Sequence, residues 1–273
     1  MNQDPKVIDD FGDEWRRYDY QDFDRLKLEE NFQQYFAIFP WHLISKTSEG
    51  FDMGCGSGRW AHFVAPRVGL LNCVEPSAAI DVAKKNLAGL QNINYHKETT
   101  EECSIRPGSQ DFGYCLGVLH HIPQTEEALL DCAKLLKPGA PMLLYLYYNF
   151  ENRPRWFKLL WGISNILRWG ISKLPHGAKK VICEAIALIV YWPLAKFSLV
   201  VSKFGLNNST LPLVDYAAKP FYQMRNDALD RFGTRIEQRF SKADIEGMLT
   251  RCGFGDIRFS DQRPYWCCVA FKR

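Results

Sequence analysis

The sequence lacks the cysteine pattern of a metal site or of a disulfide framework. Its nine cysteines are scattered over 273 residues, and only Cys267 and Cys268 are adjacent. Zinc sites and small disulfide-rich domains depend on closely spaced cysteines or histidines, and no C-x-x-C pair occurs here. We therefore expect no metal ion, and free thiols in a reducing compartment, which favours the cytoplasm.

The sequence also lacks the signals of export, of membrane spanning and of an internal repeat. Met1–Asp10 is polar and acidic, without the basic and apolar segments of a signal peptide. Val181–Trp192 is nearly all apolar, but Glu184, Pro193 and Lys196 interrupt it before it reaches the roughly 20 residues of a transmembrane helix. We therefore predict no transmembrane span. The net charge of +3 gives no indication of a nucleic-acid partner.

The sequence does contain the alternation of an α/β protein. From residue 50 onward, short apolar runs alternate with helical stretches, which is typical of a parallel sheet built from βαβ units. The strands are expected at 50–53, 70–74, 93–96, 112–116, 140–148, 256–260 and 266–271, and helices at 59–68, 78–90 and 125–136. Ser241 and Asp244 predict a capping box on a further helix that ends before Gly253. We predict a doubly wound, mostly parallel seven-stranded sheet.

Four segments follow from this pattern. Residues 1–48, rich in aromatics, form an N-terminal helical cap, and residues 49–150 form the main part of the α/β core. Residues 151–222 interrupt the order as a helical insertion, and residues 223–273 complete the core with helices and an antiparallel strand pair.

A glycine-rich turn between the first strand and the following helix predicts a nucleotide-like ligand. Its spacing is G-x-G-x-G over Gly54–Gly58, whereas the dinucleotide pattern needs a glycine where Arg59 stands. An acid, Asp52, precedes the turn, and Glu75 follows roughly 20 residues later, where a carboxylate can bind a ribose diol. An amino acid joined to a nucleoside matches all three features. A nicotinamide dinucleotide matches only the last.

Four motifs occur in an order that resembles the class I S-adenosylmethionine (SAM)-dependent methyltransferases. They are Asp52–Gly58, Val74–Ser77, Gly117–Pro123 and Leu136–Gly139. The resemblance is to the branch that includes the ubiquinone-biosynthesis and other small-molecule enzymes. It covers about residues 50–148, with a weaker similarity at 240–272. It implies a Rossmann-like methyltransferase fold, SAM as cofactor and S-adenosylhomocysteine as product.

The resemblance also implies roles for individual residues. The glycines would face the methionine part of SAM, Asp52 would support the loop beside its amino group, and Glu75 would take the ribose hydroxyls. The expected cofactor contacts are Asp52, Gly54, Cys55, Gly56, Gly58, Glu75, Pro76, Thr100, Glu101, Leu116 and Gly117. The family often has an acid in the loop after the third strand for the adenine amine. Thr99 stands there, so Thr100, Glu101 or Glu102 would have to replace it.

The candidate catalytic residues follow the fourth and fifth strands. A methyl transfer needs a nucleophile held in line with the donor and, for many acceptors, a base. His120 and His121 lie at the carboxyl edge, where open α/β sheets bind ligands, and Tyr147 reaches the same edge. The alternative is that a histidine only packs the turn before Pro123. Glu14 and Trp15, in the N-terminal segment, are candidates for a lid over the site.

The insertion differs in composition from the rest of the chain. Between Arg153 and Phe204 it carries nine basic residues and one acid, a net +8 against −5 elsewhere, together with four of the eight tryptophans. Lys158–Trp169 predicts an amphipathic helix. Such a segment can form a lid, a subdomain that packs on the sheet or makes an oligomer contact, or a surface that touches a membrane. Nucleic acid is not expected, because the basic residues are mixed with long apolar runs.

The sequence therefore predicts in-line transfer of a methyl group from SAM to an O, N, S or C nucleophile of a small molecule, lipid-linked and glycan acceptors included. The localisation expected is cytoplasmic, with peripheral membrane contact through 153–204 as one alternative. Two other functions stay open. The chain could bind SAM without catalysis and use the insertion to hold a partner, or it could be a nicotinamide oxidoreductase, which Arg59 disfavours.

Overall fold

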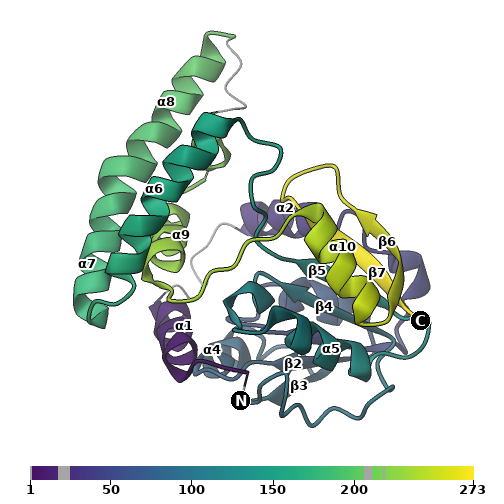
Figure 1. The fold of residues 1–273 in the computed structure, drawn as a ribbon. Coiled ribbons are helices and arrows are strands. Elements are labelled where there is room, and N and C mark those ends of the chain that lie inside the picture. Colours follow the sequence, from purple (N-terminus) through teal and green to yellow (C-terminus); the bar gives the residue numbers. More distant parts are fainter. Residues whose placement is uncertain (1, 18–24, 206–210, 218) are drawn as a thin grey trace. The chain divides into compact units, whose positions relative to one another are not determined.

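The computed structural model describes residues 2–17, 25–205, 211–217 and 219–273 (Figure 1). The chain divides into two compact units. The first consists of Met1–Asn149 together with Gln238–Arg273, and the second is Phe150–Glu237. The second unit extends past residue 222, where we expected the insertion to end. The helix Phe221–Gly233 therefore belongs with the helical unit rather than with the core.

The first unit is built on a seven-stranded sheet of order β3-β2-β1-β4-β5-β7-β6. Its strands are β1 Glu49–Met53, β2 Leu70–Val74, β3 Ile93–His96, β4 Phe112–Leu116, β5 Pro141–Tyr145, β6 Phe254–Phe259 and β7 Cys267–Lys272. β1 to β5 pair in parallel, and β7 runs antiparallel to both neighbours. The predicted sheet is confirmed. β5 ends three residues earlier than expected because its partner β7 begins at Cys267, opposite Tyr145.

Helices cover both faces of this sheet (Figure 1). They are α1 Pro5–Arg17, α2 Arg25–Tyr35, α3 Ala61–Val64, α4 Ala79–Asn86, α5 Thr125–Leu135 and α10 Lys242–Arg251, with 3-10 turns at Trp41–Leu43, Ala65–Arg67 and Leu119–His121. The helix expected at 59–68 is shorter, because Pro66 has no N–H to continue it. The capping box is confirmed: Ser241 Oγ accepts from Asp244 N at 3.0 Å, and Asp244 Oδ2 accepts from Ser241 N at 2.8 Å.

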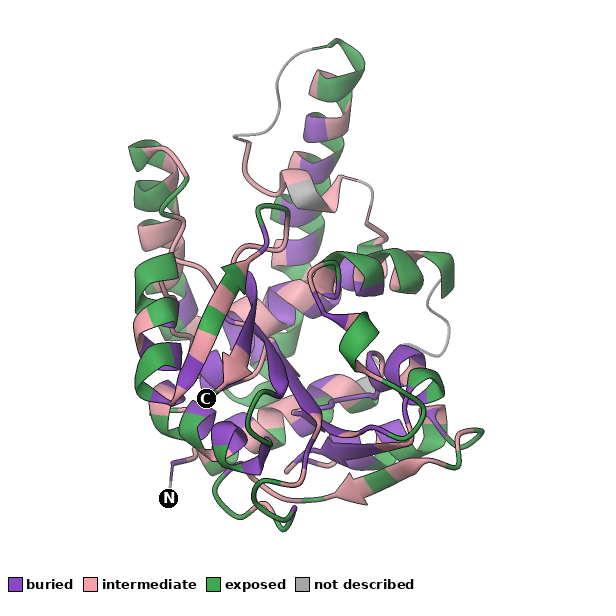
Figure 2. Cartoon of the chain, turned by 90° about the vertical axis from the view of Figure 1, so that its right-hand side faces the viewer, coloured by how far each residue is buried: buried purple, intermediate pink, exposed green. Residues whose placement is uncertain are grey.

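The core lies on the two faces of the sheet. One apolar cluster packs α5 and α10 on one face, and a second packs α2, α3 and α4 on the other. The central strands are buried along nearly their whole length, as the purple strands of Figure 2 show. The strand order reverses between β1 and β4, since β1 leads on to β2 on one side and β4 to β5 on the other. Doubly wound sheets bind ligands at the carboxyl edge of this switch point.

The second unit is entirely helical in its described part. It contains α6 Arg155–Ile171, α7 His176–Ile186, a π-helical turn Ala187–Tyr191, α8 Trp192–Lys203, a 3-10 turn Val214–Tyr216 and α9 Phe221–Gly233. The amphipathic helix predicted at 158–169 is therefore part of α6.

α7, the π turn and α8 form one continuous helix, His176–Lys203. This corrects the prediction that the apolar run is broken too early to span a membrane, because by length and composition alone the helix is able to cross one. Pro193 does not end it. The wider π turn directly before α8 lies where proline removes a backbone hydrogen bond, and π turns relieve such interruptions.

Candidate functional site

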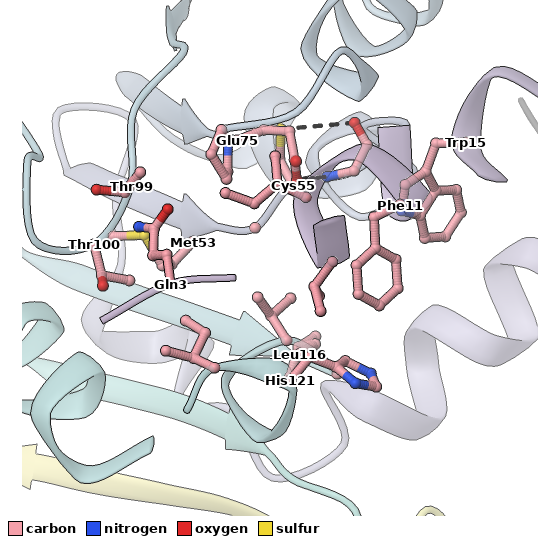
Figure 3. A pocket seen from close by; sticks show the side chains of 18 of the residues that line it. Gln3, Phe11, Trp15, Met53, Cys55, Glu75, Thr99, Thr100, Leu116 and His121 are labelled. Carbon is pink, nitrogen blue, oxygen red and sulfur yellow. Dashed lines mark hydrogen bonds between the residues drawn. The ribbon is translucent and has the colours of Figure 1, made fainter. Parts of the chain in front are cut away.

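A pocket opens at the carboxyl edge of β1, β2 and β4, inside the first unit (Figure 3). Its empty volume is about 930 Å³ when the space open to solvent is included. Most of the predicted cofactor contacts line it, namely Gly54, Cys55, Gly56, Glu75, Pro76, Thr100, Leu116 and Gly117. Asp52, Gly58 and Glu101 do not.

The glycine-rich turn passes close to its neighbours. Gly54 has a φ of +76°, and a Cβ there would lie 2.5 Å from a methyl of Val118. Gly58 has a φ of +78°, and its Cβ would lie 2.7 Å from Leu87. Only glycine adopts this conformation without strain and leaves the space free. Gly54 and Gly56 line the pocket, whereas Gly58 lies outside the lining and only allows the backbone of the turn to take its conformation.

Glu75 is held in place by the turn it faces. Its two carboxylate oxygens accept hydrogen bonds, one from Gly56 N at 3.1 Å (Figure 3) and the other from Ser77 N at 3.0 Å. Burial raises the pKa of Glu75, and the bonds from Ser77 and Gly56 lower it. A carboxylate has about four acceptor positions. The fixed Glu75 therefore keeps capacity for the two hydroxyls of a ribose.

Asp52 lies under the loop and not on the pocket wall. Burial raises its pKa to about 8, the nearby Tyr114 hydroxyl opposes this by less, and the charge of Glu75 adds to it. The Asp52 carboxyl is therefore mostly neutral at pH 7. Its Oδ2 has no hydrogen-bond partner among the residues that the structure describes. This placement suits support of the loop better than a direct ion pair with a ligand.

The opposite end of the pocket is polar. Glu98, Thr99 and Thr100 line it, and Thr100 Oγ1 is buried with no partner in the described part of the chain. Glu101, expected to contact the cofactor, points elsewhere, and its carboxylate accepts from Asn2 N at 3.1 Å. Glu98 was missed by the sequence analysis, although it is the acid of this loop that reaches the pocket.

The two candidate histidines have different surroundings. His121 lines the pocket, with its ring 4.9 Å from that of Phe11. His120 is fully buried behind it, stacked on Tyr147 with ring centroids 3.8 Å apart. Burial lowers the pKa of His120 well below its ordinary value, and the neighbouring His121 and Arg239 add to this effect. His120 is thus neutral at pH 7, and the structure places His121 rather than His120 or Tyr147 where a ligand can be touched.

Helix α1 forms a wall of the pocket that the motifs did not indicate. Its residues Val7, Ile8, Phe11 and Trp15 line the site, with Gln3 and Asp4 before it. The helix lies close to the loop after β2, since a Cβ on Gly12 would stand 3.2 Å from Ala78 N. Glu14 is buried but does not line the pocket. Trp15, a predicted lid candidate, lies in this lining, whereas the other lining residues of α1 had no sequence signal beyond the aromatic character of residues 1–48.

Contacts of two kinds hold the N-terminal segment against the rest of the first unit. Asn2 Nδ2 donates to Gln124 O at 2.8 Å, and Gln124 N donates to Asn2 Oδ1 at 2.8 Å. The Arg59 guanidinium lies 5.2 Å from the ring of Trp15 and 4.5 Å from that of Trp60. Arg59, which stands where a dinucleotide fold has glycine, therefore contacts Trp15 of α1.

These residues fit SAM as a group. Gly54 and Gly56 bring the backbone of the turn to the pocket, the fixed Glu75 suits a ribose diol, and the unpartnered Thr100 hydroxyl lies at the far polar end. Among the described residues, no group of three or more His, Cys, Asp or Glu side chains is placed to hold a metal ion.

Comparison with known proteins agrees with this site. Residues 51–144 match the family described as "Methyltransferase domain". The ubiquinone biosynthesis O-methyltransferase of Pectobacterium carotovorum is 31% identical over 176 residues, which cover 58% of this chain and 70% of the relative. The enzyme of the same name from Escherichia fergusonii is 33% identical over 175 residues, covering 58% and 69%.

Two solved structures share the fold. One belongs to a complex of the Haloferax volcanii Trm112 methyltransferase activator with a methyltransferase, at a TM-score of 0.55 and 12% identity, covering 96% of this chain and 97% of that chain. The other is a SAM-dependent methyltransferase of Methanosarcina mazei, at a TM-score of 0.51 and 16% identity, covering 86% and 98%. At such identities the likeness concerns the fold alone.

Proposed function

The chain belongs to the SAM-dependent methyltransferases, and we propose that it methylates an oxygen nucleophile on a small molecule with a large apolar part. Its methyl donor is SAM. The names of the curated relatives, O-methyltransferases of ubiquinone biosynthesis, support oxygen over nitrogen, sulfur or carbon and support an acceptor attached to a lipid chain.

One observation carries this proposal: His121 lies on the wall of the same pocket as Glu75 and the glycine turn. When bound, SAM supplies a methyl group next to a sulfonium leaving group. Gly54, Gly56 and Glu75 orient the donor, and such positioning can supply roughly 7–11 kcal/mol of the barrier. His121 takes the proton of the acceptor hydroxyl, which adds typically 10²–10⁴-fold to the rate.

The wall around His121 is apolar. Ile8 and Phe11 from α1 line the pocket together with Val118 and Ile122 from the loop after β4. An apolar wall excludes water from the reacting atoms and binds the body of the acceptor by hydrophobic contact. A hydroxyl on an aromatic or isoprenoid-like body matches this surface better than a sugar does.

The test is transfer of isotopically labelled methyl from SAM to extracted acceptors. The protein is incubated with labelled SAM and either the organic-solvent or the aqueous fraction of a cell extract, and the labelled product is identified by mass spectrometry. We expect an O-methyl product in the organic fraction, and less of it from the Glu75→Ala variant at a SAM concentration near the Kd of the unchanged chain. Label found only in the aqueous fraction, or on nitrogen or sulfur, would refute the proposed acceptor but not SAM binding.

A further inference from the structure

Exposed apolar side chains are concentrated in the second unit. Among the described residues, nineteen large hydrophobic side chains are exposed, and all but Leu26, Leu43 and Leu130 lie between residues 156 and 221. Single exposed leucines are ordinary on protein surfaces, but a contiguous set marks a surface that contacts something apolar.

The exposed residues of α6 follow one another along the helix without a charge. Leu159, Ile163, Ile166 and Leu167 are 53–72% exposed, and no charged residue stands between Lys158 and Arg168. The long helix α7–α8 carries a second set, with Leu188, Ile189, Trp192, Phe197 and Val200 45–70% exposed. Both helices pack on α9. We call the two sets, one on α6 and one on α7–α8, together the apolar face.

The apolar face is not the surface on which the unit folds. The buried side of α7–α8 consists of residues about one turn apart, namely Lys179, Cys183, Ala187, Tyr191, Ala195 and Ser198. α7 packs with α9 on that side. Only 22% of the most apolar window of the long helix is buried, so most residues of this window are exposed or half-buried (Figure 2).

The charges around the apolar face are nearly all positive. Of the nine basic residues between 153 and 204, Lys173, Lys180, Lys196 and Lys203 are exposed on or beside the long helix. Glu184 is the only acid there, and its carboxylate pairs with Arg225 at 2.7 Å. Trp169 is 62% exposed, with Lys173 Nζ 3.1 Å from its ring centroid. Basic residues beside tryptophan and aliphatic side chains are the composition of a helix that lies in the interface of an anionic membrane.

We propose that the apolar face docks on an anionic lipid bilayer and lies in its interface. A second copy of the chain fits less well, because it would bring another net +8 against the first. A spanning orientation of α7–α8 fits less well too. Its buried side packs on α9, which carries Arg225, Asp227 and Arg231, and charged residues are costly inside a bilayer.

The first test is flotation of the full chain with lipid vesicles. We expect binding to vesicles of phosphatidylcholine with phosphatidylglycerol at low salt, and little binding to phosphatidylcholine alone. Binding should weaken as salt rises toward 1 M, where the Debye length falls from about 10 Å to about 3 Å. Alkaline carbonate should release the chain. Equal binding to both vesicle types, or retention after carbonate treatment, would contradict an interfacial anionic site.

Variants separate the apolar and the charged contributions. Leu167→Glu with Ile189→Glu should abolish flotation, since both side chains are exposed and their replacement leaves the fold intact. Lys173→Gln with Lys180→Gln should weaken it about 30-fold, since each lysine near an anionic surface contributes about 1 kcal/mol. The matched control is Leu26→Glu, 72% exposed in the first unit, which should float like the unchanged chain.

Self-association must be measured on the same samples. If the unchanged chain forms a dimer that the Leu167→Glu, Ile189→Glu variant dissociates, and no flotation occurs, the apolar face is an interface between copies and the proposal is wrong. If the variant floats as well as the unchanged chain while circular dichroism shows both folded, the apolar face is not the contact surface and the proposal is also wrong.

Discussion

Glu75 is the residue on which ribose recognition depends in the proposed complex. Its carboxylate is fixed by the N–H groups of Gly56 and Ser77 and lines the pocket. Glu75→Ala should weaken binding of SAM by about 1–3 kcal/mol, the range for losing hydrogen bonds to a charged group. Isothermal titration calorimetry measures this, with the exposed Asp81→Asn on α4 as control. Unchanged affinity in the Glu75 variant would remove this residue from the site.

The buried Asp52 carboxyl makes the stability of the folded protein depend on pH. Its pKa is about 8 in the folded protein against 3.8 as the reference value, so folding keeps a proton on this carboxyl at pH 7. The contribution of Asp52 is most favourable below pH 4 and is lost as pH rises toward 8.

Asp52→Asn imitates the protonated form and removes this dependence. The free energy of unfolding of the variant, relative to the unchanged chain, should rise by about 1.4 kcal/mol per pH unit between about pH 5 and pH 7. Urea unfolding at several pH values measures the difference. A difference that does not change with pH would mean that Asp52 is ionised in the folded protein.

His121 is expected to act as the base, because its ring is at the pocket wall while His120 is stacked behind it on Tyr147. His121→Ala should lower kcat by 10²-fold or more and leave SAM affinity unchanged. The half-buried His62, on α3 and outside the pocket lining, provides the control His62→Ala. Full-rate turnover by His121→Ala would show that the acceptor needs no base at this position.

At the scale of elements, α1 decides whether the pocket is closed. A Cβ on Gly12 would meet Ala78 N at 3.2 Å, so the larger Gly12→Val should push α1 away from the loop after β2. Overpacking of this kind costs about 1–3 kcal/mol, and we expect SAM affinity to fall by roughly 5- to 150-fold. Gly89→Val is the matched control, because nothing lies within 4 Å of its Cβ position. Equal affinities in the two variants, measured by calorimetry, would show that α1 is not needed to hold the donor.

The parts of the fold that the sequence predicted are those with a strong local pattern. β2, β3 and β4 have the expected bounds because buried parallel strands are short apolar runs between turn residues. The glycine turn and Glu75 were predicted because glycine spacing and a carboxylate at a strand end are local features. The continuous helix across Pro193 was missed, since a π turn leaves no recognisable sequence signal.

The missed parts of the site depend on contacts between distant segments. The α1 wall forms through bonds such as that of Asn2 to Gln124, which join residues 122 positions apart. Because His120 and His121 are adjacent in the sequence, the sequence does not show which ring lines the pocket and which is buried behind it. Glu101, which was expected at the cofactor, accepts a hydrogen bond from Asn2 N instead, and Glu98, for which no role was predicted, lines the pocket.

In the whole molecule, the donor pocket and the exposed apolar surface belong to different compact units. Every residue that lines the donor pocket belongs to the first unit, whereas nearly all exposed large apolar side chains belong to the second. The charge is divided in the same sense, with +8 between residues 153 and 204 and −5 over the rest of the chain. An enzyme for acceptors attached to lipid would gain from this division, because one unit carries the chemistry while the other contacts the bilayer.

The central claim is that the pocket beneath α1 holds the donor with its ribose on Glu75 and its methionine part on the glycine turn. A crystal structure of the chain with S-adenosylhomocysteine tests it most directly. We expect density over Gly54 and Gly56, with both ribose hydroxyls within hydrogen-bond distance of Glu75 and the homocysteine sulfur on the side of His121. Density for the ligand outside this pocket, or a ribose that does not contact Glu75, would contradict it.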